Sequence, residues 1–292
     1  MYSITISMDP DIVELFGRFP IGWHGIMVVL ALVSGLALTF YLAKKDGLLK
    51  QLADTDEGVD EEGDKPKKKS GGVIEQLLPL ILVAVIAGIL GSRLFHVVDQ
   101  WEYFSNNLRE ILNLWEGSSI IGAVVGGAVG AAIYTKLAGW SWTRLGKIAD
   151  VAAPGSILAM AVGRIGCIIN GDAYGTATSL PWGFIYTHPN RAILESTSYV
   201  GHPAPAYEII WDMLIFAFLM VFRKKLRPAG VSYWLYLSLY SLGRFLITFV
   251  RVNDPYLWGL KQAQVVTLFI MIIVVPLLIY LIWNREKYKD YV

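Results

Sequence analysis

Several apolar runs of about 18 residues or more limit this chain to one class of fold. A helix rises about 1.5 Å per residue, so roughly 20 apolar residues are needed to cross the hydrocarbon core of a bilayer. Only 17% of the residues are charged, whereas about a quarter is usual in a soluble domain. The sequence therefore predicts an all-α integral membrane protein.

Seven membrane-spanning helices can be drawn from the apolar runs. They cover residues 21–43, 74–97, 117–137, 150–169, 206–222, 230–250 and 263–283. The fourth is the least regular, because it holds four residues that bend or end helices. These are Pro154, Gly155, Gly163 and Gly166. Residues 1–19 have no basic start and no small-residue cleavage site, so we expect the first run to be a retained helix.

Residues 44–73, between the first two spans, have the composition of a flexible linker. An acidic stretch is followed by Lys65, Lys67, Lys68 and Lys69 and then by Ser-Gly-Gly. Such a segment cannot bury a core, and we interpret its lysines as an orientation signal rather than a lipid-binding surface. We therefore expect one membrane domain over residues 1–292, with a charged cytoplasmic linker.

The basic residues of the loops indicate how the chain is oriented. Loops on one side hold 17 lysines and arginines, and loops on the other side hold 5. Because the more basic side faces the cytoplasm, the N-terminus and residues 98–116, 171–205 and 251–262 are predicted to be outside. The C-terminus is then cytoplasmic, and 171–205 is a long extracytoplasmic loop. The net charge of +1 gives no general attraction to nucleic acid.

Glycines repeat along one face of the third span. Gly122, Gly126 and Gly130 are four residues apart, so they form a groove into which another helix can pack. A lipid tail in the same groove is the less favoured interpretation.

Three arginines, Arg93, Arg164 and Arg244, lie inside or at the edges of the apolar spans, each nearer the outer end. An arginine in the membrane costs at least a few kcal/mol, so such residues face a protein interior or a water-filled cavity. One interpretation is structural: they reach the headgroups or pair with nearby acids. The acids are Asp99, Asp172 and Asp254. Three arginines at one side favour a shared cavity for a phosphate, which guanidinium binds through two parallel hydrogen bonds.

Residues 163–175 combine an arginine with glycines and polar groups. Glycines let backbone N–H groups approach a ligand oxygen. Asn170 can donate and accept hydrogen bonds, and Asp172 can hold an arginine or act as a base. These residues predict an anion-binding turn at the outer membrane face.

This segment resembles the signature of the bacterial prolipoprotein diacylglyceryl transferase family, Gly-Arg-x-Gly-Asn-Phe-x-Asn-Gly-Glu-x-x-Gly. Other matching pieces follow in order along almost the whole chain. They are Trp23-His24-Gly25, Gly91-Ser92-Arg93, Trp115-Glu116-Gly117, Asp150 with Ala153-Pro154, Pro181-Trp182-Gly183, His202-Pro203 with Tyr207-Glu208, and Tyr240, Arg244 and Arg251 with Asp254-Pro255.

The resemblance implies transfer of a diacylglyceryl group from phosphatidylglycerol to the lipobox cysteine of a preprolipoprotein, with release of glycerol phosphate. The enzyme would be a multi-pass protein of the bacterial inner membrane. Fixed arginines would stabilise the phosphate leaving group. The implied catalytic residues, with His24 in place of a family tyrosine, are Arg164, Arg244, His24 and Tyr240. The implied substrate-binding residues are Arg93, Asn170, Gly171, Asp172, Gly175, His202, Glu208 and Arg251.

No cofactor is expected, because the sequence has no Walker loop and no cluster of His and Cys ligands. Four polar positions of the family pattern differ here: Cys167 replaces Asn, Asp172 replaces Glu, Ile121 stands where a His or Tyr is frequent, and Thr248 stands where a Glu is expected. Two other functions stay open, a lipid transporter or flippase and a lipid-binding relative without this activity. Broken helices and charged residues in the membrane also occur in transporters, but no internal repeat joins the two halves.

The same differences leave the group that deprotonates the thiol unassigned, and His24 is one hypothesis because an imidazole titrates near neutral pH. An intramembrane histidine is more often a hydrogen-bonded structural group. If His24 is the base, His24→Phe lowers the rate of thiol lipidation about 100-fold or more. The rate is measured by weighing a lipobox peptide after incubation with phosphatidylglycerol. Unchanged activity would remove His24 from the mechanism.

Overall fold

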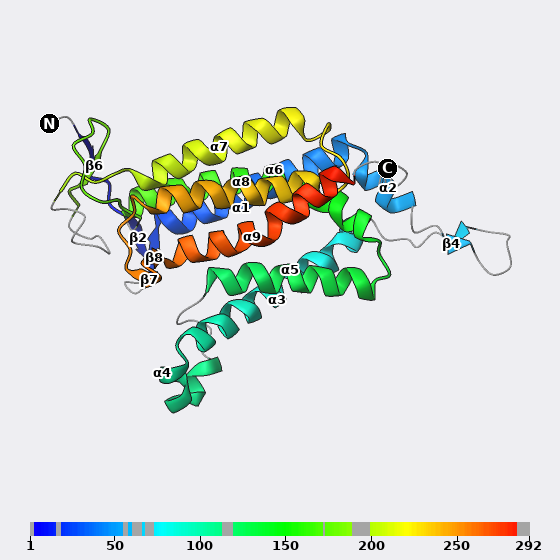
Figure 1. Cartoon of the computed structure of the whole chain (residues 1–292), viewed down its shortest axis with the longest axis horizontal. Helices are drawn as coiled ribbons and strands as arrows, with labels where there is room; N and C mark the ends of the chain where they lie inside the picture. Colours follow the sequence, from blue (N-terminus) through cyan, green and yellow to red (C-terminus); the bar gives the residue numbers. More distant parts are fainter. Residues whose placement is uncertain are drawn as a thin grey trace. The chain divides into compact units, whose positions relative to one another are not determined.

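Among the residues that the computed structural model describes, a helix lies in each of the seven ranges predicted to span the membrane. These residues are 3–15, 19–54, 58–59, 66–67, 73–112, 119–171, 173–188 and 199–284. The seven helices are α1 (Trp23–Lys45), α3 (Val73–Asp99), α5 (Ile120–Leu137), α6 (Trp142–Asn170), α7 (Ala204–Phe222), α8 (Val231–Thr248) and α9 (Gln262–Trp283) (Figure 1). Shorter helical segments are α2 (Leu48–Asp54), α4 (Trp101–Asn106) and the 3-10 helix η1 (Leu108–Leu112).

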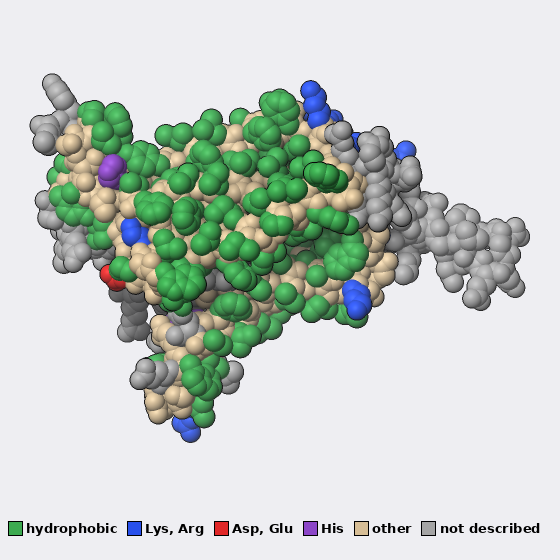
Figure 2. Space-filling model, in the orientation of Figure 1, with side chains coloured by type: hydrophobic (Ala, Val, Ile, Leu, Met, Phe, Trp, Pro, Cys, Tyr) green, Lys and Arg blue, Asp and Glu red, His purple; other side chains and the backbone are tan. Residues whose placement is uncertain are grey.

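Among the residues described above, five helical segments are long and apolar enough to cross a membrane. They are Trp23–Lys45, Leu77–Val98, Trp142–Asn170, Ala204–Phe222 and Gln262–Trp283. Their outward side chains are large and hydrophobic, and hydrophobic side chains cover the visible face of the helices (Figure 2). Such a surface is stable in lipid and not in water. The chain is therefore a mainly helical multi-pass membrane protein, while the total of seven spans and the orientation stay predictions.

Short strand pairs join segments outside the long helices. In the parallel pair, β1 (Ile4–Ile6) lies beside β6 (Phe184–Tyr186), with Ile4 opposite Phe184. The antiparallel pairs are β2 (Asp11–Leu15) with β3 (Phe19–Gly22), β4 (Gly58–Val59) with β5 (Pro66–Lys67), and β7 (Pro255–Leu257) with β8 (Leu260–Lys261). The β1–β6 pair ties the N-terminal segment to the loop that follows α6.

The chain divides into two compact units, one of residues 1–43 with 146–292 and one of residues 44–145. The predicted linker 44–73 belongs to the second unit, where α2, β4 and β5 are its described parts; most of its acidic and lysine stretches lie outside the described residues. A single domain over residues 1–292 stays a prediction.

In the second unit, α3 and α5 pack through the predicted glycine groove. A methyl group placed on Gly91 of α3 would meet the carbonyl oxygen of Gly122 and lie 2.9 Å from the Cα of Gly126. A methyl group on Gly130 would lie 2.5 Å from the Cβ of Ala87. The backbones approach so closely only because these side chains are absent or small. Helix packing in the groove is confirmed.

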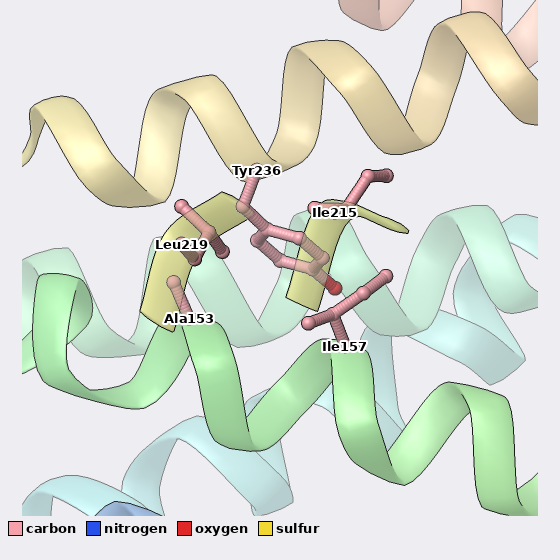
Figure 3. Packing of buried hydrophobic residues seen from close by; sticks show 5 residues of the cluster. All are labelled: Ala153, Ile157, Ile215, Leu219 and Tyr236. Carbon is pink, nitrogen blue, oxygen red and sulfur yellow. The ribbon is translucent and has the colours of Figure 1, made fainter. Parts of the chain in front are cut away.

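In the first unit, α6 packs through two opposite faces. Gly155 and Gly166 lie on the face that contacts α1, whereas Ala153 and Ile157 lie on the other, because successive helical residues are about 100° apart. On that second face Ala153 and Ile157 meet α7 and α8 in a buried apolar cluster. The cluster is Ala153, Ile157, Ile215, Leu219 and Tyr236, with the Tyr236 ring pointing from α8 toward α6 (Figure 3).

The expected irregularity of the fourth span was wrong, because α6 runs unbroken for 29 residues with Pro154 inside it. Neighbouring helices support proline and glycine within a membrane helix, where every other backbone group must be bonded internally. Helix α6 also contacts the start of α8 through Asp150. Its carboxylate accepts hydrogen bonds from the backbone N–H groups of Gly230 (2.7 Å) and Tyr233 (3.0 Å). The carboxylate thereby satisfies N–H groups that the first turn of α8 leaves unbonded.

The α1–α6 crossing yields a stability prediction. A methyl group on Gly35 would lie 2.7 Å from the Gly155 carbonyl oxygen and 2.9 Å from the Cβ of Ala159. We expect Gly35→Ala to lower the free energy of unfolding in detergent by about 1–3 kcal/mol, since overpacking forces the helices apart. Gly25→Ala is the matched control in the same helix, because a methyl group there meets nothing within 4 Å. Equal effects of the two variants would contradict the close crossing.

Candidate active site

Three arginines of the first unit converge on one buried carboxylate, Glu208 of α7. Arg164 Nε lies 2.5 Å from Glu208 Oε2, an ion pair in which the N–H is not aligned for a hydrogen bond. Arg244 Nη1 donates to Oε1, and Arg251 Nη1 donates to the same oxygen at 3.2 Å. The Glu208 side chain is 5% exposed, and the three arginines are 11–19% exposed. The result is a mostly buried charge cluster, called here the Glu208 cluster.

The direction of the helices explains why these residues meet. Arg164 lies near the end of α6, Arg244 near the end of α8, and Glu208 near the start of α7. Consecutive antiparallel helices place the ends of α6 and α8 beside the start of α7. Pro205 in the first turn of α7 fits there, because the backbone N–H that proline lacks would have no partner within the helix.

The Glu208 cluster has positive charge and hydrogen-bond donors to spare. A guanidinium has five N–H donors and always carries its charge. Glu208 uses Nη1 of Arg244 and of Arg251, and no other group among the described residues accepts from these two side chains. Arg164 also directs Nη1 at Cys167 Sγ, at 3.8 Å. Three guanidiniums around one carboxylate can therefore bind an additional anion.

Sequence analysis missed a second acid at this place, Asp212. It lies one turn after Glu208 on the same face of α7, is 2% exposed, and interacts electrostatically with Arg164, Glu208 and Arg244. Its Oδ2 has no hydrogen-bond partner among the described residues. A signal was present in the sequence, since an acid within a predicted span is by default a candidate functional residue.

Of two further predicted residues, Tyr240 lies near Arg164 and Asn170 lies at the end of the same helix. Tyr240 of α8 interacts electrostatically with Arg164 and packs beside Tyr236, with ring centroids 6.3 Å apart. Asn170 is the last residue of α6 and is half-buried. Tyr240 can therefore orient the arginine, as its position in the family pattern suggests.

The loop after α6 is hydrogen-bonded to the segment after α8, which positions Arg251. Gly175 and Arg251 form an antiparallel bridge, and Thr176 N donates to Val250 O at 2.8 Å. A Cβ on Gly175 would lie 2.5 Å from the His202 carbonyl oxygen, so only glycine fits there. Gly171 ends α6 with φ of +74°, a conformation that favours glycine. Asp172, between them, lies outside the described residues.

His202 and Lys261 support the cluster from its surroundings. His202 Nδ1 lies 3.3 Å from the Tyr207 hydroxyl, which also accepts from Trp182 Nε1 at 3.0 Å. Lys261 Nζ donates to the carbonyl oxygens of Thr248 (2.9 Å) and Arg251 (2.5 Å), at the end of α8 where the helix leaves carbonyls unbonded. Desolvation and the Arg251 guanidinium lower the pKa of the Lys261 ammonium.

The expected turn over residues 163–175 was wrong for its first part, and whether its second part binds an anion stays a prediction. Residues 163–170 continue α6, so their N–H groups are bonded within the helix, and the left-handed turn begins only at Gly171. Gly163 and Gly166 serve packing instead: a Cβ on Gly166 would lie 3.1 Å from His24 Cα and 3.1 Å from Met27 Cβ. If this part of α6 contacts an anion, the side chain of Arg164 is the group that can do so.

The structural pairing proposed for the arginines was also different. Glu208, rather than Asp254, is the acid that Arg164 and Arg244 contact, and the side chains of Asp99 and Asp172 lie outside the described residues. Glu208, which the resemblance implied as a substrate-binding residue, is thus the carboxylate that the arginines share.

The described contacts of Arg93 and His24 are with residues outside the Glu208 cluster. Arg93 belongs to the second unit, where Nε donates to Ile111 O at 2.9 Å, Nη2 donates to Glu110 O, and Cζ lies 5.0 Å from the Phe104 ring centroid. His24 lies beside Gly166, on the face of α6 opposite Arg164.

The fold and this cluster define a class: a multi-pass helical membrane protein with several arginines around one buried carboxylate, where α6 and α8 end and α7 begins. The family model described as prolipoprotein diacylglyceryl transferase matches residues 10–280. The chain belongs to the prolipoprotein diacylglyceryl transferase family.

Similar proteins extend over nearly the whole chain. A phosphatidylglycerol–prolipoprotein diacylglyceryl transferase of Dehalococcoides mccartyi is 38% identical over 98% of this chain and 97% of its own length. Proteins of the same name from Symbiobacterium thermophilum (33% identical, 99% of this chain and 98% of its own) and Clostridioides difficile (32% identical, 89% and 90%) are also similar.

The Glu208 cluster yields a second stability prediction. Glu208→Gln removes the carboxylate that three mostly buried guanidiniums share and leaves them with excess positive charge despite the nearby Asp212, so we expect the free energy of unfolding to fall by about 3–5 kcal/mol. Denaturant unfolding in detergent measures the loss. Adding Arg251→Gln to this variant removes one repelling charge and should restore part of the stability, as should added phosphate. A double variant less stable than Glu208→Gln would contradict the charge argument.

Proposed function

We propose that this protein transfers the diacylglyceryl group of phosphatidylglycerol to the lipobox cysteine of a prolipoprotein and forms a thioether. Two observations support the proposal. Similar proteins over nearly the whole length carry the name of this activity, and three guanidiniums surround a single carboxylate in the Glu208 cluster. The second observation carries the chemistry, because the reaction breaks a bond to a phosphate.

Phosphatidylglycerol is a suitable ligand for this cluster. Its phosphodiester has one negative charge, and the spare N–H donors of Arg164 and Arg244 suit two phosphate oxygens. Arg251 adds a third charge, held in place by Glu208 and by the bridge to Gly175. Glu208 itself prevents the arginines from separating, so the donors are already placed when the lipid enters.

The reaction follows from where charge develops. The thiolate sulfur attacks the glyceryl carbon that carries the phosphate oxygen, and a C–S bond forms as the C–O bond breaks. The electron pair of that bond goes to the phosphate oxygen, which leaves as glycerol phosphate with additional negative charge. Arg164 and Arg244 stabilise this charge more strongly than that of the bound lipid, which lowers the barrier.

The other predicted residues take supporting roles in this proposal. Tyr240 orients Arg164, while Asn170, Gly171, Asp172 and Gly175 shape the end of α6 and the loop beyond it. His202 and its partner Tyr207 support the start of α7. Arg93 binds lipid or fixes the segment after α3, and His24 remains the alternative proton acceptor that His24→Phe tests.

The proposed topology places the cluster in the leaflet where the acceptor peptide arrives. Seven spans with the N-terminus outside and the C-terminus in the cytoplasm put the ends of α6 and α8 and the start of α7 at the outer face of the bacterial inner membrane. This orientation rests on the excess of Lys and Arg in the opposite loops. Lipid headgroups and an exported signal peptide are both present there.

The activity is tested with the purified protein in nanodiscs that contain phosphatidylglycerol. A synthetic lipobox peptide is added, and its mass is followed over time. We expect a gain of one diacylglyceryl group with the wild type. Arg164→Lys should lower the rate by about 100-fold or more, because lysine keeps the charge but loses the paired donors.

Two controls define the result. A peptide with the lipobox cysteine replaced by serine should gain no mass, and Arg227→Lys, at an exposed position between α7 and α8, should act as the wild type does. No mass gain with the wild type, under conditions in which a Dehalococcoides mccartyi relative is active, would refute the proposed function.

A further inference from the structure

Asp212 is a buried acid that the proposed reaction has not yet used. It is 2% exposed, and Oδ2 has no hydrogen-bond partner among the described residues. A buried polar atom without a partner costs free energy, so its persistence needs a reason. Asp212 lies between two environments on one face of α7: Glu208 with its arginines is one turn before it, and Ile215 and Leu219 of the apolar core follow it.

The charged and titratable groups that face Asp212 come from three helices. They are Arg164 of α6, Glu208 of α7, and Arg244 and Tyr236 of α8. Glu208 is already engaged by three arginines and is poorly suited to take up a proton. Tyr236 directs its hydroxyl at Met160 Sδ, 3.4 Å away. Of the two carboxylates, Asp212 has an oxygen, Oδ2, with neither a hydrogen bond nor an ion pair among the described residues, whereas both oxygens of Glu208 contact arginines.

The charge of the cluster depends on Asp212 in a way that matches the reaction. With both acids ionised, three arginines leave one excess positive charge, which the singly charged phosphodiester of phosphatidylglycerol neutralises. With Asp212 protonated the excess is two, which a doubly charged phosphomonoester neutralises. Glycerol phosphate, the leaving group, is such a monoester and is largely doubly charged above pH 7, since its second pKa is about 6.

We propose that Asp212 Oδ2 receives the thiol proton, so that the buried cluster stays neutral from bound phosphatidylglycerol to bound glycerol phosphate. This proposal rests on the proposed diacylglyceryl transfer. The S–H bond gives its proton to the carboxylate, sulfur forms the bond to carbon, and the electron pair of the broken C–O bond goes to phosphate. Every charge that appears on the leaving group is matched by a charge lost at Asp212, within a region where unbalanced charge is costly.

Proton uptake on binding the product tests the proposal without catalysis. Glycerol phosphate is titrated into the wild-type protein at pH 8, in buffers with different ionisation enthalpies, and calorimetry gives the protons bound per ligand. We expect about one proton for the wild type. Accordingly, its affinity for glycerol phosphate should fall by about tenfold per pH unit as the pH rises above 8.

Three variants separate this role from a structural one. Asp212→Asn has nearly the same shape but cannot be protonated, so its uptake should fall to near zero and its affinity should no longer depend on pH. Asp212→Glu should keep the uptake, as should His24→Phe. Asp150→Asn is the control, because it removes a half-buried carboxylate of the same unit that accepts hydrogen bonds from backbone N–H groups. This variant should lower stability and keep the uptake.

The transfer assay supplies a second readout. In Asp212→Asn the proton must leave for bulk water, so the rate should fall about 100-fold at pH 7 and rise about tenfold per pH unit. The wild-type rate should change little between pH 7 and 8.5. A purely structural role of Asp212 would lower the rate by the same factor at every pH.

The outcomes are distinct. A wild type that transfers lipid but binds glycerol phosphate without proton uptake overturns the proposal and leaves the function standing. Equal uptake in the wild type and Asp212→Asn also overturns it, as does a wild type that fails to bind glycerol phosphate. Uptake of one proton without any lipid transfer refutes the proposed function. Asp212 would then not accept a thiol proton, although its protonation would still depend on the charge of the bound anion.

Discussion

The interaction of Glu208 with three arginines is the constraint on which the site depends. Charges in an apolar interior are tolerated only when they are paired and well bonded. Because Arg164, Arg244 and Arg251 share one carboxylate, the end of α6, the end of α8 and the start of α7 are held at fixed separations. An anion that enters then meets donors already in place, so little of its binding free energy is lost in ordering them.

Packing of small residues keeps the helices in the places that this cluster requires. Gly35 and Gly155 allow α1 and α6 to cross closely, while Ala153 and Ile157 on the other face of α6 support α7 and α8. The same face of α6 carries Arg164 farther along, and the same face of α7 carries Glu208, Asp212, Ile215 and Leu219 in order. The apolar core and the charged site are therefore continuous, and the core fixes the register in which the charges meet.

Part of this site was predictable from the sequence, and the rest was not, for physical reasons. Arg164 and Arg244 were expected to share a cavity because an arginine is costly in lipid unless it has a polar environment. Their common partner was not predicted, because Glu208 lies 36 residues from Arg244 along the chain and spacing gives no contact between separate helices. Asp212 was not predicted, because its partners lie on two other helices and a single acid within an apolar span does not identify them. The unbroken α6 was not predicted, because low helix propensity in water does not decide whether proline is tolerated within a membrane. There, neighbouring helices and side chains can bond the backbone groups that proline leaves unbonded.

Thr248 shows that the net charge of the cluster depends on how many carboxylates contribute to it and not on which position supplies them. The family pattern has a glutamate there, but Thr248 is fully buried and its hydroxyl donates to the Arg244 carbonyl oxygen at 2.5 Å, so it contributes no charge. Asp212 approaches the same arginines from α7 instead. With Glu208 it restores two acids against three guanidiniums, and two acids are what a singly charged lipid phosphate requires for neutrality. One of the two must also be free to change its charge when the phosphate gains one, and Asp212, with its unengaged oxygen, meets both conditions.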